Sequence, residues 1–171
     1  AKSIQSQLRK IKAGVTVVRS VRDYARKRDK FLSWIDSVPR LLNHPDVLRW
    51  NTDKHYLQEQ EKRGLPIVPT AWLEPGDKLS RHQVHTRMPA GGDFVVKPAI
   101  SSGGRGTGRY TSTDARSRSE AIVHVMDDMN DGRTVMVQRY LDSVDRQGEL
   151  SLVHLNGLAS YTVEKEPILH P

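Results

Sequence analysis

Residues 94–110 read FVVKPAISSGGRGTGRY and combine a short apolar run with a glycine-rich loop. The segment begins as a short apolar strand that ends at Lys97, continues through a loop of glycine, serine and arginine, and returns to regular structure at Tyr110. Glycine and serine allow backbone N–H groups to approach an anion closely, and a lysine at the strand end adds positive charge. These residues alone fit a phosphate-binding loop and a solvated surface hairpin equally well.

The loop does not match two known phosphate motifs. Gly103 and Gly108 have the spacing of a Walker A loop, but Arg109 and Tyr110 occupy the positions that require Lys and Ser or Thr. The glycines also fall at offsets that differ from those of the dinucleotide fingerprint.

Composition limits the class of protein. The 171 residues, 36% of them hydrophobic, suffice for one ordinary domain or part of a larger protein. There is no cysteine, which fits a reducing, cytoplasmic location. No apolar run is long enough to cross a membrane, and the N-terminus lacks the apolar core of a signal peptide. The net charge of +7 favours an anionic partner such as a nucleic acid, an acidic lipid surface or a nucleotide.

The first half of the chain is predicted to contain both helices and strands. Ile4, Leu8 and Ile11 predict a short helix, residues 15–18 a buried strand, and residues 29–38 an amphipathic helix. Asn51 or Thr52 is suited to cap a helix that runs to Arg63, followed by an edge strand over residues 67–72 and a polar loop over residues 74–92. That cap places Lys54 in a first helical turn, where a cation is unfavourable unless an anion lies nearby; the alternative is an exposed lysine.

The second half predicts an antiparallel sheet. Ser117 and Glu120 match a capping box that begins a helix ending near Asn130. A strand over residues 134–141, a polar loop over residues 142–148, and a hairpin around Asn156-Gly157 follow. With the glycine loop, the prediction is an α+β fold.

No Ser-His-acid triad or pair of carboxylates is evident, and His82 and His85 lack a clear third metal ligand. The recurring feature is instead a pair of lysines at structured positions, Lys54 and Lys97, combined with a glycine loop and an acidic residue on a later strand. This combination is typical of a nucleotide site.

Five segments in order resemble the ATP-grasp superfamily, in particular the branch that contains the D-cycloserine-forming ligase and related carboxylate-amine ligases. They are residues 17–20 (VVRS) with 23–24 (DY), 49–54 (RWNTDK), 94–99 (FVVKPA), 135–141 (VMVQRYL) and 148–152 (GELSL). The resemblance implies antiparallel sheets with flanking helices. It divides the chain into a remnant of an N-terminal α/β domain (1–48), a connecting segment (49–92), a lid subdomain with the glycine-rich loop (93–141) and the start of a C-terminal core (142–171).

The resemblance also implies roles for individual residues. Lys54 and Lys97 would contact the phosphates of ATP, with Lys97 also beside the adenine, and the loop from Ser101 to Gly108 would close over the triphosphate. The loop residues expected to take part are Ser101, Ser102, Gly103, Gly104 and Arg105. The hinge beside the adenine would consist of Gln138, Arg139, Tyr140 and Leu141. Glu149 would accept hydrogen bonds from the ribose.

Two departures from the family pattern stand out. Glu164 occupies the neighbourhood of a family arginine, so a phosphate contact there would depend on Lys165. The family's magnesium ligands would lie beyond Pro171, which leaves no metal ligands in the chain, and the N-terminal domain is shorter than the family's. We therefore expect an incomplete ATP-grasp module.

The expected function is that of an ATP-dependent ligase, or of its nucleotide-binding portion, which uses ATP and magnesium to join a small carboxylate to an amine through an acylphosphate. The protein would supply no nucleophile of its own. One alternative is a basic nucleic-acid-binding module, although few aromatic residues are placed for base stacking. Another is a truncated, inactive paralogue.

Overall fold

The computed structural model describes residues 14–19, 21 and 23–169, and the chain divides into two compact units. The first unit comprises residues 1–67 with 100–102, and the second comprises residues 68–99 with 103–171. The helix predicted around Ile4, Leu8 and Ile11 lies outside the described residues. The four-part domain division remains a prediction.

The first unit is a small α/β arrangement. Strand β1 (Thr16–Val17) pairs in parallel with β2 (Leu41–Leu42), and helix α2 (Arg28–Ser37) connects them. The predicted helix is confirmed: its apolar residues Phe31 and Ile35 pack against Leu48 to form the core of this unit. The predicted burial of the first strand is wrong, since Val15 and Val17 remain 52% and 59% exposed.

The helix predicted to end at Arg63 is present but begins later than expected, at Tyr56, and a second short helix that was not predicted precedes it. Helix α3 (Pro45–Asn51) begins with proline in its first turn, and the His44 ring accepts a hydrogen bond from the Asp46 N–H. Thr52 therefore ends α3 instead of capping the next helix. Helix α4 (Tyr56–Lys62) follows, so that Lys54 lies in the turn between the helices.

A four-stranded antiparallel sheet organises the second unit. Its strand order is β3 (Thr70–Leu73), β6 (Val135–Arg139), β4 (Asp93–Pro98) and β5 (Gly108–Thr111). The register aligns Val96 with Val137 and Phe94 with Tyr110. β3 is an edge strand, as the proline predicted, but it begins after Pro69 and not at Ile67.

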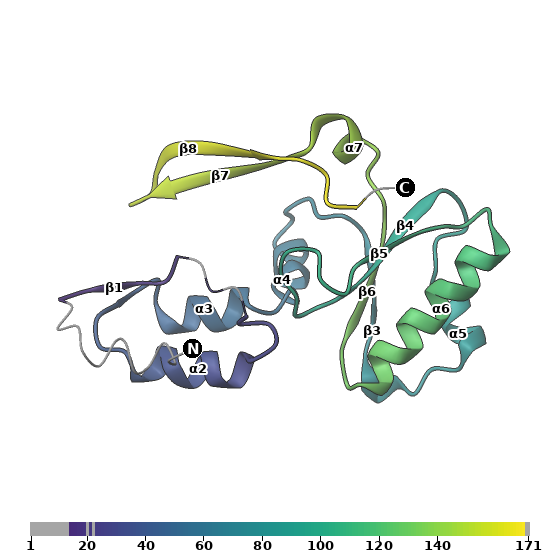
Figure 1. Ribbon diagram of the computed structural model, residues 1–171, viewed down its shortest axis with the longest axis horizontal. Coiled ribbons are helices and arrows are strands. Elements are labelled where there is room, and N and C mark those ends of the chain that lie inside the picture. The colour runs from purple at the N-terminus through teal and green to yellow at the C-terminus, as the bar shows by residue number, and fades with distance from the viewer. Residues whose placement is uncertain (1–13, 20, 22, 170–171) are drawn as a thin grey trace. The chain divides into compact units, whose positions relative to one another are not determined.

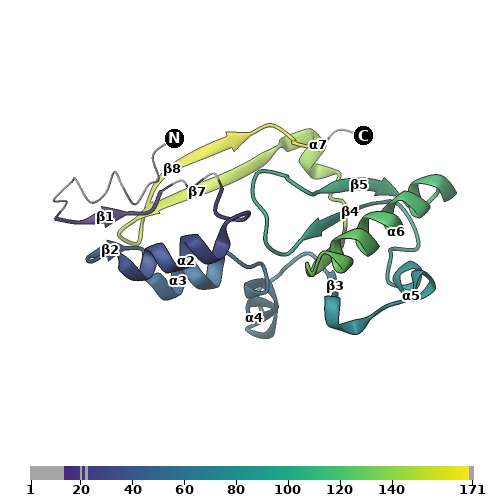
Figure 2. The ribbon, with the colours of Figure 1, turned by 60° about the horizontal axis from the view of Figure 1, so that its bottom comes forward.

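Helices α5 (Arg81–Thr86) and α6 (Ala115–Asn130) lie along the same face of this sheet (Figures 1 and 2). Their apolar side chains pack against those of the strands in one continuous core. Its buried residues include Leu73, Val84, Met88, Phe94, Val96, Ala121, Ile122, Val125, Met129, Val135 and Val137. The opposite face of the sheet is not covered by α5 or α6.

Two predictions for these helices are wrong. Residues 74–92 are not simply a loop, because they contain a 3-10 turn (Pro75–Asp77) and α5, which is capped by reciprocal bonds between Ser80 and Gln83. The cap of α6 is Asp114, whose carboxylate accepts from the N–H groups of Arg116 and Ser117. The Ser117 hydroxyl instead accepts a hydrogen bond from the Thr111 N–H at the end of β5.

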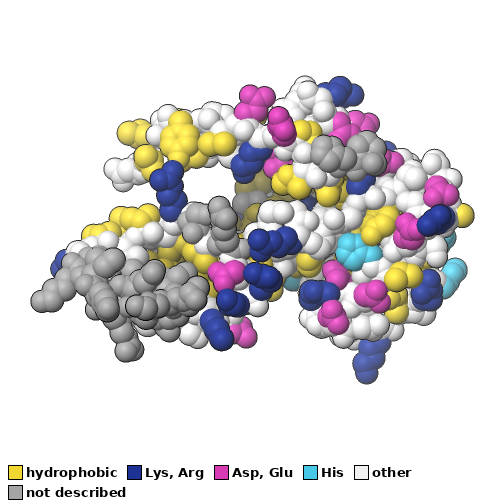
Figure 3. All heavy atoms as spheres, viewed as in Figure 1, with side chains coloured by type: hydrophobic (Ala, Val, Ile, Leu, Met, Phe, Trp, Pro, Cys, Tyr) yellow, Lys and Arg dark blue, Asp and Glu magenta, His cyan; other side chains and the backbone are white. Residues whose placement is uncertain are grey.

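The predicted hairpin is confirmed. Strands β7 (Glu149–Leu155) and β8 (Leu158–Lys165) pair around Asn156 and Gly157, both of which have positive φ, as a type I′ turn requires. A short helix, α7 (Ser143–Gln147), occupies the segment predicted as a polar loop. Apolar side chains project into solvent along the hairpin (Figure 3): Leu150, Leu152, Leu155 and Leu158 are each at least 61% exposed.

Candidate functional site

The strand register determines which side chains share the face of the sheet opposite α5 and α6. Lys97 lies opposite Met136, and Val95 lies opposite Gln138. Directly paired residues of antiparallel strands project to the same side, as do alternate residues of one strand. Lys97 and Gln138 therefore share a face, and this face is opposite the one covered by α5 and α6.

Lys97 is a half-buried cation on that face. Burial lowers the pKa of its amine, and the negative charge of Glu149 acts in the opposite direction. A charged group in this position is poorly hydrated, so it gains more from an anionic ligand than a fully hydrated lysine would. Glu149, at the start of β7, is thus near enough to Lys97 of β4 to influence its charge.

The glycine loop has a backbone conformation that depends on its glycines. Gly103, Gly104 and Gly106 all have φ between +62° and +70°, a region that other residues rarely adopt. A Cβ on Gly104 would also lie 2.8 Å from the Ile168 side chain. Arg105 is exposed at the tip of the loop, between these glycines.

The start of the loop is anchored within the first unit. The Lys54 ammonium donates to the Ser101 hydroxyl at 2.8 Å and to the Ser101 carbonyl at 3.1 Å. The Tyr24 hydroxyl donates to the same carbonyl at 3.3 Å. Lys54 and Ser101, both predicted site residues, are therefore in direct contact, and Ser102 follows as a half-exposed residue.

The predicted hinge, residues 138–141, comprises the last two residues of β6 and the two residues that follow it. The Gln138 amide is buried and donates to the Thr70 hydroxyl at 2.6 Å, so its side chain serves to fix β3 against β6. The Tyr140 N–H donates to the Asp93 carbonyl at 2.9 Å, and Leu141 is exposed. Arg139 lies opposite Phe94, which directs its side chain to the face that carries the helices.

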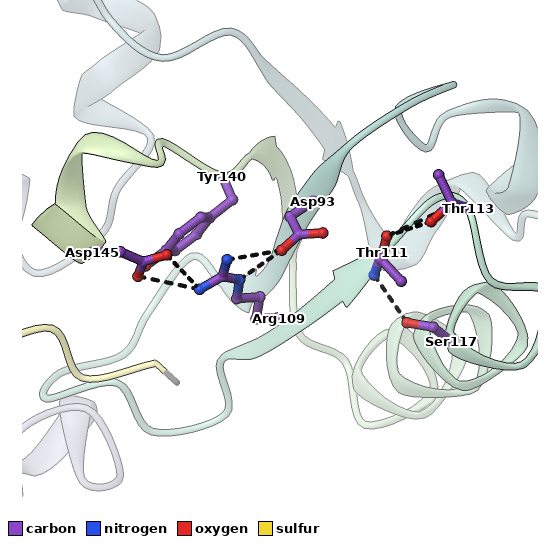
Figure 4. A network of polar contacts seen from close by, with 7 residues as sticks. All are labelled: Asp93, Arg109, Thr111, Thr113, Ser117, Tyr140 and Asp145. Carbon is purple, nitrogen blue, oxygen red and sulfur yellow. Dashed lines mark hydrogen bonds and ion pairs between the residues drawn. The ribbon is translucent and has the colours of Figure 1, made fainter. Parts of the chain in front are cut away.

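A polar network that the sequence did not reveal fixes the hinge to β5 (Figure 4). The Arg109 guanidinium lies 2.8 Å from the Asp93 carboxylate and 2.9 Å from that of Asp145 in α7. It also stacks over the Tyr140 ring, 3.8 Å from the centroid, and the Tyr140 hydroxyl donates to Asp145. In the sequence, nothing links Arg109 to Asp93 or to Asp145, which lie 16 and 36 residues away along the chain.

Magnesium, which the family resemblance implies, finds no ligand set in the described part of the chain. No group of three or more His, Cys, Asp or Glu side chains suited to a metal occurs there. His85 instead contacts the Arg118 guanidinium at 3.2 Å. The described residues do include the half-buried Lys97 and the loop of positive-φ glycines that follows it. No helix in the described part of the chain is long and apolar enough to cross a membrane.

Comparison with solved structures shows the class of fold. The chain matches D-alanine-D-alanine ligase from Helicobacter pylori with a TM-score of 0.59 and 13% identity, over 91% of this chain and 48% of that one. Such ligases have the ATP-grasp fold, so the predicted α+β fold class is confirmed.

The resemblance extends to a particular relative. The crystal structure of D-cycloserine synthetase DcsG matches with a TM-score of 0.79 and 29% identity, over 94% of this chain and 55% of that one. In sequence, the chain is 32% identical over 160 residues to the cycloserine biosynthesis protein DcsG of Streptomyces lavendulae, which is 91% of this chain and 52% of the relative. Residues 8–43 match the family described as the N-terminal domain of D-cycloserine synthetase DcsG.

These matches confirm the predicted resemblance to the D-cycloserine ligase branch of the ATP-grasp superfamily. The chain spans about half the length of the DcsG proteins that it matches.

Proposed function

We propose that this chain is the nucleotide-binding part of an ATP-grasp ligase and that it binds the phosphates of ATP. The observation that carries the proposal is Lys97, a half-buried cation on the face of the sheet opposite α5 and α6, whose charge Glu149 influences and which a loop of positive-φ glycines follows in the chain. The name of the relative, D-cycloserine synthetase, supports a ligase reaction. Lys97 and the N–H groups of the loop would neutralise the phosphate charge, Lys54 would act through Ser101, and Glu149 would accept from the ribose.

The proposed reaction joins a carboxylate to an amine. A carboxylate oxygen of the substrate attacks the γ-phosphorus of ATP, ADP leaves, and the amine then displaces phosphate from the acylphosphate. Magnesium, when bound with ATP, would neutralise charge on the phosphate oxygens. The contribution of this chain is to bind and orient the nucleotide, since none of these steps requires a nucleophile from the protein.

Thermal stabilisation by ATP tests the binding step. A ligand at 100 times its Kd stabilises the folded state by about 2.7 kcal/mol, so ATP with magnesium should raise the melting temperature in a concentration-dependent manner. Lys97→Met should weaken ATP binding about tenfold or more, because a charge-assisted hydrogen bond contributes roughly 1.5–3 kcal/mol.

Lys30→Met is the matched control, since Lys30 is exposed on α2 and loses the same charge. Its ATP-induced shift should equal that of the unmodified protein. Absence of any shift at about 5 mM ATP, well above usual substrate affinities, would refute the proposal.

A further inference from the structure

An open cavity lies on the face of the sheet that carries α5 and α6, opposite Lys97. Its volume is about 630 Å³, which is within the range of small-molecule sites. It lies between the edge strand β3, the neighbouring strand β6, and the segment that follows α5. The lining residues are Pro69, Thr70, Ala71, Arg87, Met88, Pro89, Ala90, Gly91, Val137 and Arg139.

Two arginines give this cavity its charge. Arg87 follows α5, and Arg139 ends β6 with its guanidinium close to Gly92, 3.7 Å from the position a Cβ there would occupy. Neither guanidinium forms an ion pair with an acidic side chain of the described residues, and no carboxylate lines the cavity. Both groups therefore retain their full capacity to bind an anion.

The rest of the cavity is apolar and held in place. Ala71, Met88 and Val137 form part of, or pack against, the core beneath α5 and α6. The wall formed by residues 87–91 is fixed from behind, because the Pro89 carbonyl accepts from the Arg118 guanidinium at 2.9 Å and from the Ser112 hydroxyl at 2.8 Å. A preformed wall reduces the entropic cost of binding.

We infer that this cavity binds a small organic anion, in which a carboxylate or phosphate contacts Arg87 and Arg139 and an apolar group covers the exposed parts of Pro69, Ala71 and Pro89. A free inorganic anion would leave the apolar surface uncovered, and a neutral apolar molecule would leave both arginines without a partner. This site is distinct from the proposed nucleotide site, because the register directs the Arg139 and Lys97 side chains to opposite faces of the sheet. The inference does not depend on the proposed function.

The test is a titration of the ¹⁵N-labelled chain followed by NMR. The probes are phenyl phosphate, phenylacetate, inorganic phosphate and benzyl alcohol. Phenyl phosphate or phenylacetate should shift the amide signals of Ala71, Ala90 and Val137 in a saturable manner. The comparison of these two probes identifies which anionic group is preferred, and inorganic phosphate and benzyl alcohol should each bind at least about fivefold more weakly.

Arg87→Gln should weaken binding of the preferred probe about fivefold to tenfold. Arg63→Gln is the matched control, because Arg63 is also an exposed residue at the C-terminal end of a short helix, α4. It removes the same charge without touching the cavity. Arg139→Gln provides a second variant if the first fails to fold.

Equal affinity for benzyl alcohol, or equal losses in the Arg87 and Arg63 variants, would overturn the inference, since the anion would then be held by general charge or not at all. The thermal shift of Arg87→Gln with ATP separates this site from the nucleotide site. That shift should remain at its original value, whatever the outcome for the nucleotide proposal.

Discussion

Replacement of Arg109 by methionine tests the network that holds the hinge. The Arg109 side chain is only 11% exposed, whereas its partners Asp93 and Asp145 are 32% and 33% exposed. Breaking a fully buried ion pair costs about 3–5 kcal/mol, and breaking an exposed one costs less than about 1 kcal/mol. Partial exposure of the carboxylates places the expected loss between these limits, at roughly 2–3 kcal/mol, including the contact with the Tyr140 ring.

Calorimetry and hydrogen exchange measure this effect. For a chain of this size, the loss corresponds to a decrease in melting temperature of about 4–12 °C. Exchange should accelerate most at the amides of β5 and of the hinge, because these are the elements that Arg109 joins. A double-mutant cycle with Asp93→Asn should give a coupling energy of about 1–2 kcal/mol.

Arg116→Met is the control for that experiment. Arg116 forms an ion pair with Glu120 at the same distance of 2.9 Å, but its side chain is 86% exposed. We expect its loss to cost less than about 0.5 kcal/mol. If Arg109→Met destabilises the protein no more than Arg116→Met, the network does not hold the hinge and the argument from burial is wrong.

Three further changes probe buried and strained groups. Burial raises the pKa of Asp128, so the native state binds its proton more tightly; Asp128→Asn should stabilise the protein at pH 8, and urea denaturation should show this gain shrinking as pH falls through the folded pKa. Burial lowers the pKa of Lys97, so the charged lysine destabilises the folded state at pH values below its folded pKa. In that pH range the ligand-free Lys97→Met variant should melt at or above the temperature of the unmodified protein, although its response to ATP decreases. The difference in melting temperature should disappear as pH approaches 10.5. Gly148 has φ +66°, and a Cβ there would collide with the Lys165 carbonyl oxygen, so Gly148→Ala should cost about 2 kcal/mol or more, measured against Gly76→Ala, where the space is open.

Local patterns in the sequence predicted elements whose formation depends on near neighbours. Asn156-Gly157 specified the hairpin, because only residues that tolerate positive φ form its turn. The periodic apolar residues of α2 and α6 specified two helices. Helix caps were less predictable, because a serine hydroxyl can bond either to its own helix or to another element. In the folded chain the Ser117 hydroxyl accepts from the Thr111 N–H of β5. The short helix α5 lacked a long enough apolar pattern to be recognised.

The sequence by itself determined that Lys54, Lys97 and the glycine loop are candidates for binding phosphate, because residue type and order carry that information. Only the tertiary structure decided that Lys97 is half-buried with Glu149 nearby, that Lys54 contacts Ser101, and that Arg109 joins β5 to Asp145, 36 residues away. The physical reason is that burial and ion pairing depend on strand register, and register assigns each side chain to one face of the sheet through contacts between segments far apart in the chain.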